Sequence, residues 1–259
     1  MKHDLFISLD AERKHRLATI ATLRANADNA VASHISAAVL HGLDLWDTSL
    51  ERVHMTVLNG HRRTTPRMHV HTTALSDKFV TTSEGLRMTT IDRTVIDCSR
   101  IMDLDHAVVI GDSALRSKKV SMDQLRAAVQ SSTRAAGIGA ARRAISSMNG
   151  LSESPGESLS RLRMAEFGFP DPILQQVLEV QGRFLARVDF YWKRWKLVGE
   201  FDGLGKYASG ESNVKEKMRE DDMRDRGLEV IRWTWKDLWN FGSVRAKFDR
   251  ACQRVERRR

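Results

Sequence analysis

The chain has 259 residues, and its 42 lysines and arginines exceed its 33 aspartates and glutamates, giving a formal net charge of +9. A hydrophobic fraction of 41% allows a buried core and excludes wholesale disorder. No apolar run approaches the roughly 20 residues that span a bilayer, and no apolar signal region follows the first residues. We therefore expect a cytoplasmic protein without a membrane partner, whose positive charge favours contact with phosphates.

Residue types segregate along the chain, which indicates two modules. All nine histidines lie at or before His106, whereas five of the six tryptophans lie at or after Trp192. Residues 148–156, between these two regions, are rich in turn formers. We therefore expect one module over residues 1–149 and a second over residues 150–259, and together they predict an α+β protein.

The first module has the pattern of a mainly helical unit with a small sheet. Apolar residues at helical spacing predict helices, and period-two alternation predicts two strands. The expected helices cover residues 11–26, 33–43, 91–101, 106–115 and 122–130, and the expected strands cover residues 53–57 and 68–71.

Histidine pairs in this module raise the question of a metal site. His34 and His41 are seven residues apart and would share a helix face, and His69 and His71 would share a strand face. Neither pair has the HxxxH or HExxH spacing of a zinc motif. The chain has two cysteines far apart in sequence, which excludes a cysteine-based zinc module. We interpret the histidines as polar surface or packing residues.

The second module alternates helices and strands, which is typical of an α/β domain with a four-stranded mixed sheet flanked by helices. Its strands are expected to carry most of the chemistry. The expected strands cover residues 174–180, 184–192, 197–202 and 228–235, and the expected helices cover residues 154–167, 214–226 and 236–255.

Acidic residues within these strands point to a metal site. Asp189 lies inside a strand, and Glu200 and Asp202 are two positions apart, so they share one face. Burying acids on a sheet without a partner costs several kcal/mol, and a divalent cation such as Mg²⁺ offsets that cost. Such an ion lowers the pKa of a bound water, and Lys206 follows the strand closely enough to orient that water.

Five blocks of this module resemble the PD-(D/E)XK nuclease superfamily, and within it the small Vsr-like endonuclease domains. The blocks are residues 187–190, 199–203, 206–207, 216–221 and 230–235. The resemblance implies a restriction-endonuclease-like fold in which a helix glutamate, a strand aspartate and a strand glutamate hold Mg²⁺, with Mn²⁺ as a substitute.

In this sequence the resemblance assigns the metal to Glu157, Asp189 and Glu200. Asp202 stands where the superfamily has its lysine, so the resemblance implies that Asp202 assists and that Lys206 or Lys217 supplies the base. Each acid also has a simpler interpretation. Asp189 would be a salt-bridge partner, Glu157 a charge at a helix N-terminus, and the other two acids solvent-facing groups on an edge strand.

The first module resembles the AbiEi-type antitoxins of type IV toxin–antitoxin systems in actinobacteria and their phages. The resemblance lies in residues 33–43 and 89–97. Such proteins often begin with a DNA-binding winged helix, and here only a shortened helix precedes Ser33. A cognate toxin is therefore an expected partner.

These observations favour a metal-dependent DNA endonuclease, or a nuclease-like effector, in phage defence or a toxin–antitoxin setting. DNA would be the partner, and cutting both strands favours a homodimer. The residues expected to contact the DNA backbone are Arg187, Lys193, Arg194, Lys196, Lys217 and Arg232. Asp202 at the lysine position keeps open a non-catalytic DNA-binding antitoxin or repressor, and the first module keeps open a toxin-neutralising protein module.

Overall fold

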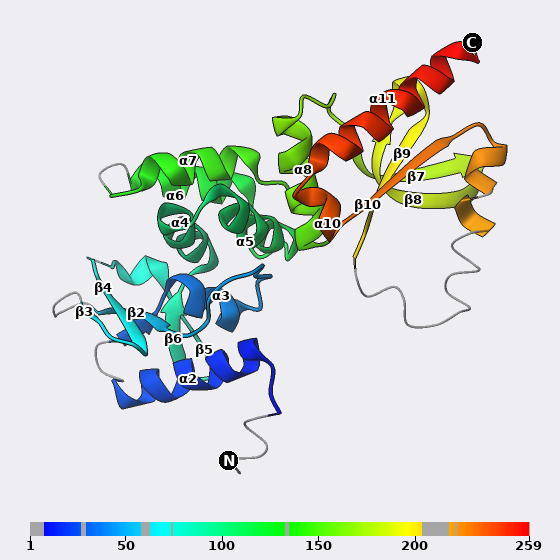
Figure 1. Cartoon of the computed structure of the whole chain (residues 1–259). Coiled ribbons are helices and arrows are strands. Elements are labelled where there is room, and N and C mark those ends of the chain that lie inside the picture. Colours follow the sequence, from blue (N-terminus) through cyan, green and yellow to red (C-terminus); the bar gives the residue numbers. More distant parts are fainter. Residues whose placement is uncertain are drawn as a thin grey trace. The chain divides into compact units, whose positions relative to one another are not determined.

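The computed structural model describes residues 8–26, 30–57, 63–73, 75–132, 135–203, 218–220 and 222–258. The chain forms two compact units, Met1–Gly150 and Leu151–Arg259, each containing helices and one sheet (Figure 1). The division lies next to the one expected from the sequence. In the part of the chain that is described, no helix is both long and apolar enough to cross a membrane.

The first unit is built on a six-stranded sheet with the strand order β3-β4-β2-β1-β6-β5. The pairs β1–β6 and β2–β4 are parallel, and the other neighbours are antiparallel. The strands are β1 (Ala30–Ala32), β2 (Val53–Val57), β3 (Arg63–Thr64), β4 (Met68–Thr72), β5 (Val80–Ser83) and β6 (Leu86–Thr89).

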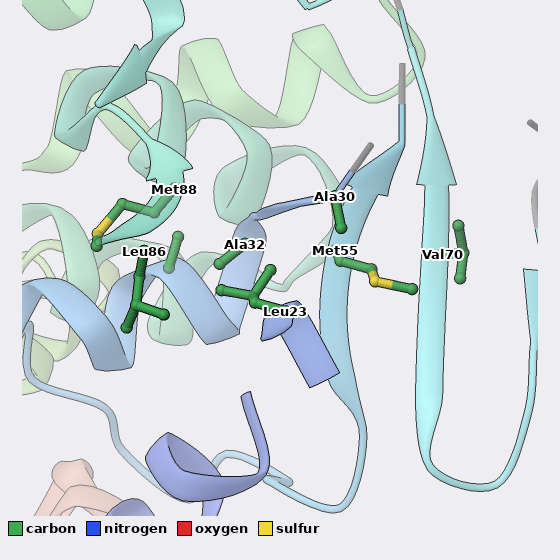
Figure 2. Close-up of a cluster of buried hydrophobic side chains, with 8 residues drawn as sticks. Leu23, Ala30, Ala32, Met55, Val70, Leu86 and Met88 are labelled. Carbon is green, nitrogen blue, oxygen red and sulfur yellow. The ribbon is translucent and has the colours of Figure 1, made fainter. Parts of the chain in front are cut away.

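One face of this sheet forms the apolar core that Figure 2 shows. Met55 of β2 and Val70 of β4 lie in this core with apolar side chains of β1 and β6. Leu23 of α2 (Ala11–Ala25) and Ala37 of α3 (His34–His41) pack against them. Because side chains alternate along a strand, the intervening residues of β2 and β4 face the other side.

The remaining helices of this unit form a group next to one another in Figure 1. They are α4 (Ile91–Ile101), α5 (Leu104–Arg116), α6 (Met122–Ser131) and α7 (Ile138–Ser147). A short 3-10 helix, η1 (Asp77–Phe79), precedes β5. Helix α4 begins after Thr90 as expected, and α6 begins with a capping box between Ser121 and Gln124.

The sheet of the first unit is larger than the small sheet expected from the sequence. Strand β1 is the sequence Ala-Val-Ala, and alanine has a low strand propensity, so its position in the sheet comes from pairing with β2 and β6. Helix α7 was also not expected. Its residues 138–147 include glycine and serine, which weaken a helical pattern.

The second unit contains a four-stranded sheet with the order β10-β9-β8-β7, in which β9 and β10 are parallel and the other pairs antiparallel. This mixed sheet agrees with the expectation. Its strands are β7 (Ile173–Val180), β8 (Arg183–Trp192), β9 (Leu197–Asp202) and β10 (Glu229–Thr234), and η2 (Lys193–Trp195) joins β8 to β9. Its helices are α8 (Pro155–Glu166), α10 (Trp235–Leu238) and α11 (Phe241–Arg257), and residues 218–220 and 222–225 are also helical.

Aromatic rings and glycines fix how α8 and the sheet pack together. The indole Nε1–H of Trp233 donates a buried hydrogen bond of 2.7 Å to the Oγ of Ser160 on α8. Gly156 lies so close to the ring of Phe201 that a β-carbon there would overlap the ring. Gly199 leaves room for the ring of Trp233, which would lie 2.8 Å from a β-carbon at that position. These contacts hold the first turn of α8 against β9.

We predict that Gly156→Ala lowers the free energy of unfolding by about 1–3 kcal/mol, because the new methyl group overpacks the contact with Phe201. Gly242→Ala is a matched control, since Gly242 is likewise the second residue of a helix and its nearest neighbour would lie 3.7 Å from the new carbon. That control should be neutral or stabilising by up to about 1 kcal/mol. Urea denaturation of both variants measures the difference, and equal stabilities would contradict this packing.

Candidate functional site

The carboxylate of Glu157 is held within the first turn of α8. Ser154, the N-cap residue, accepts the Glu157 backbone N–H at 3.3 Å and donates its hydroxyl to Oε1 at 2.8 Å. The backbone N–H of Glu153 donates to Oε2 at 2.9 Å. This geometry satisfies backbone donors at the helix start, and the positive end of the helix dipole stabilises the negative charge. Glu157 is buried, with 8% of its surface exposed.

Gln175 of β7 connects Glu157 to Asp189. Its side-chain Nε2 lies 2.8 Å from Oε2 of Glu157 and 3.5 Å from Oδ1 of Asp189. The other oxygen of Asp189 accepts the backbone N–H of Phe201 on β9 at 3.0 Å. The two carboxylates therefore lie around a single amide group. Gln175 was not predicted, because a neutral side chain on a strand has no distinctive pattern in the sequence.

Glu200 of β9 is held by two arginines. It is 3% exposed, and its Oε1 lies 2.7 Å from Nη2 of Arg219. Its Oε2 lies 2.7 Å from Nη2 of Arg232. Arg232 is directly opposite Glu200 in the parallel register of β9 and β10, so their side chains share a face of the sheet.

Arg232 also binds the two other acids nearby. Its Nη1 lies 3.2 Å from Oδ1 of Asp202, and its Nε lies 3.1 Å from Oε2 of Glu220. The guanidinium is thus surrounded by three carboxylates, and removing it would leave the buried carboxylate of Glu200 with one fewer counter-charge. A contact between Arg232 and DNA, as expected from the sequence, would compete with these ion pairs.

The other expected DNA contacts lie elsewhere. Arg187 pairs with Glu153 at 2.6 Å, and both are exposed. Three exposed cations lie at the β8–β9 connection, which is about 13 Å from Glu200 at the usual rise per strand residue. They are Lys193, Arg194 and Lys196. Lys206 and Lys217, the expected bases, lie outside the described residues.

The donor chemistry of this region suits a hard cation. Mg²⁺ prefers oxygen ligands and is often bound by one or two carboxylates together with water and substrate phosphate. The pair formed by Glu157 and Asp189 fits that requirement. Glu200, whose charge two arginines balance, would join the pair only if one arginine moved. Within the described ranges, no three acids bring ligand oxygens within 4.8 Å of one another.

The group that does meet this distance lies in the first unit and consists of His34, His54 and His71. The sequence indicated that His69 and His71 share a face. It did not indicate that His34 and His54 lie beside them, because that depends on how α3, β2 and β4 come together.

No protein-family model and no solved structure matches the chain. It is similar to two uncharacterized proteins of Mycobacterium tuberculosis, MT2308 of strain CDC 1551 / Oshkosh and Rv2248 of strain H37Rv. Each is 29% identical over 203 residues, which cover 78% of this chain and 73% of the relative.

Proposed function

We propose that the second unit is a metal-dependent DNA nuclease with a restriction-endonuclease-like arrangement, acting in phage defence or a toxin–antitoxin setting. The observation that carries the proposal is the group formed by Glu157, Gln175 and Asp189, with Glu200 on the adjacent strand. The order of these acids along a helix and two strands is the order that the resemblance to PD-(D/E)XK nucleases implies.

In this proposal Glu157 and Asp189 hold the ion, and the chain's own groups keep them in place. Ser154 and the Glu153 N–H fix one carboxylate, and the Phe201 N–H fixes the other. Bound Mg²⁺ would neutralise charge on the phosphate and lower the pKa of a water. Lys206 is proposed to orient that water.

A second candidate function is DNA binding without catalysis, as in an antitoxin or repressor. The observation that favours it is the neutralisation of Glu200 by Arg219 and Arg232. An acid that is already balanced by two cations attracts a metal ion less strongly. Asp202, which stands where the nuclease superfamily has its lysine, also favours DNA binding without catalysis.

Plasmid nicking in Mg²⁺ or Mn²⁺ distinguishes the two functions. We predict that Asp189→Asn reduces nicking by on the order of 100-fold or more. Even the loss of a residue that only hydrogen-bonds a metal ligand lowers metal affinity or activity by about 10–100-fold. Asparagine retains an acceptor for the Phe201 N–H, so the fold should persist. Glu166→Gln is the control, because it removes an exposed acid at the far end of α8 and should leave nicking unchanged.

Two results would overturn the nuclease proposal. One is equal nicking by the wild type and Asp189→Asn, which would indicate a contaminating activity. The other is tight, metal-independent DNA binding by a wild type that does not nick, which would support the second function.

We also predict that DNA binding depends on the cations of the β8–β9 connection. Replacing Lys193, Arg194 and Lys196 by glutamine should weaken DNA binding. It should also make the slope of log K against log salt concentration less negative by about 0.9 for each lost phosphate contact. A variant that replaces three exposed cations of the first unit has the same net charge and serves as control. Its substitutions are Arg13→Gln, Lys119→Gln and Arg126→Gln. Fluorescence anisotropy over a salt series measures both slopes, and identical slopes would exclude this surface.

A further inference from the structure

Four histidines of the first unit lie on or beside one face of its sheet. His54 of β2 is opposite His69 of β4 in the parallel register, and His71 follows two residues later on β4. Met55 and Val70, which alternate with them, belong to the apolar core on the other face. The histidines therefore lie opposite the cluster of Figure 2, on the side where the sheet is polar.

Three of these imidazoles converge. Nδ1 of His54 lies 3.1 Å from Nε2 of His71. The ring of His34 stacks on the ring of His71, with centroids 3.6 Å apart. Each of the three offers a ring nitrogen, and these nitrogens all lie within 4.8 Å of one another. Zinc–nitrogen bonds are about 2.0–2.1 Å long, so the stacked rings of His34 and His71 would tilt apart to bring all three nitrogens onto one ion.

The backbone of His34 is held in a conformation that suits this convergence. His34 is the first residue of α3 and has a φ of +51°, in the left-handed region that non-glycine residues seldom occupy. Such strain persists where the surrounding structure requires it. Its Nδ1 lies 3.0 Å from the Oγ of Ser33, which fixes the ring and leaves Nε2 as the other nitrogen. In metal-binding histidines the ring nitrogen that does not bind the metal usually forms a hydrogen bond of this kind.

The cluster is suited to neutral imidazole, the form that binds metal ions. Burial, with smaller contributions from His69, His15 and Arg52, lowers the pKa of His54 to about 4. Burial also lowers the pKa of His34 well below its usual value, with further contributions from His71, His54, Arg100 and Arg93. Asp97, which is buried between these two arginines, offsets part of their positive charge.

We propose that His34, His54 and His71 form a binding site for a divalent transition-metal ion of the zinc class. Imidazole ligands suit Zn²⁺ and its neighbours rather than Mg²⁺. Three histidines leave a coordination position for water or another ligand. His54 and His69 also line a cavity of about 410 Å³ beside Glu51 and Asp103, which provides a path for the ion. The ion would link α3, β2 and β4, and this site is separate from the function proposed for the second unit.

The test uses the full chain without a polyhistidine tag, stripped of metal by EDTA and dialysed. Titration with Zn²⁺ against a chromophoric chelator should show one site per chain with a Kd below about 1 μM. At a free Zn²⁺ concentration 100 times the Kd, the Tm of the transition that includes the first unit should rise by roughly 5–10 °C. The visible spectrum of the Co²⁺-loaded protein should show that the ligands are nitrogens in a low-coordinate site.

His54→Gln and His71→Gln should each weaken Zn²⁺ binding by on the order of 100-fold or more, since they remove a direct ligand. His71→Gln is the safer variant, because His71 is half-buried whereas His54 is buried. His41→Gln is the matched control. Its ring contacts the backbone oxygen of Thr89, outside the cluster, and glutamine can keep that contact.

The control should bind Zn²⁺ as the wild type does, and circular dichroism should show that all variants are folded. Failure of the wild type to bind one Zn²⁺ per chain with a Kd below about 1 μM would overturn the proposal. Unchanged binding by a folded His71→Gln variant would overturn it as well.

Discussion

A carboxylate that leaves water must gain hydrogen-bond donors or a counter-charge, and this requirement determines the arrangement of the second unit. Glu157 and Glu200 are both buried, and they meet the requirement in different ways. Glu157 accepts hydrogen bonds from uncharged groups of Ser154, Gln175 and the backbone, which do not neutralise its negative charge. Glu200 lies against two guanidinium groups, which cancel its charge. The charge of Glu157 is therefore still able to attract a cation, whereas the charge of Glu200 is already balanced by two arginines.

The same short strand serves both the acids and the core. Glu200 and Asp202 alternate with Phe201 on β9, so the acids face Arg232 while the phenyl ring packs against Gly156 of α8. The backbone N–H of Phe201 also donates to Asp189. Because one strand fixes both, a change in the contact between α8 and Phe201 would alter the positions of the carboxylates. Packing and site geometry are thus coupled in this unit through three consecutive residues.

Strong local patterns in the sequence were enough to place the main elements. Residues 53–57 and 197–202 were expected to form strands, and β2 and β9 have these bounds in the structure. The mixed four-stranded sheet and the positions of the acids on its strands were also expected. By contrast, β1 has only three residues and little strand propensity, so its place in the sheet depends on its partners.

The parts of the sites that were not predicted depend on contacts between distant residues. Gln175 joins two acids, and Arg219 reaches Glu200, but a glutamine and one arginine among many carry no distinguishing pattern. The histidine pair on β4 was visible as a period-two spacing. Its meeting with His54 required the parallel pairing of β2 and β4, which the sequence does not specify.

The two units offer ligands of opposite character, and this bears on how each is interpreted. Carboxylate oxygens such as those of Glu157 and Asp189 favour hard ions, and their negative charge attracts a cation in proportion to its charge. The imidazoles of His34, His54 and His71 are uncharged when deprotonated, so they attract an ion through their nitrogen lone pairs and hold transition metals in preference to Mg²⁺. A single ion therefore does not suit both places. The excess of positive charge over the whole chain does not prevent either site, because each depends on the few groups within several ångströms of it.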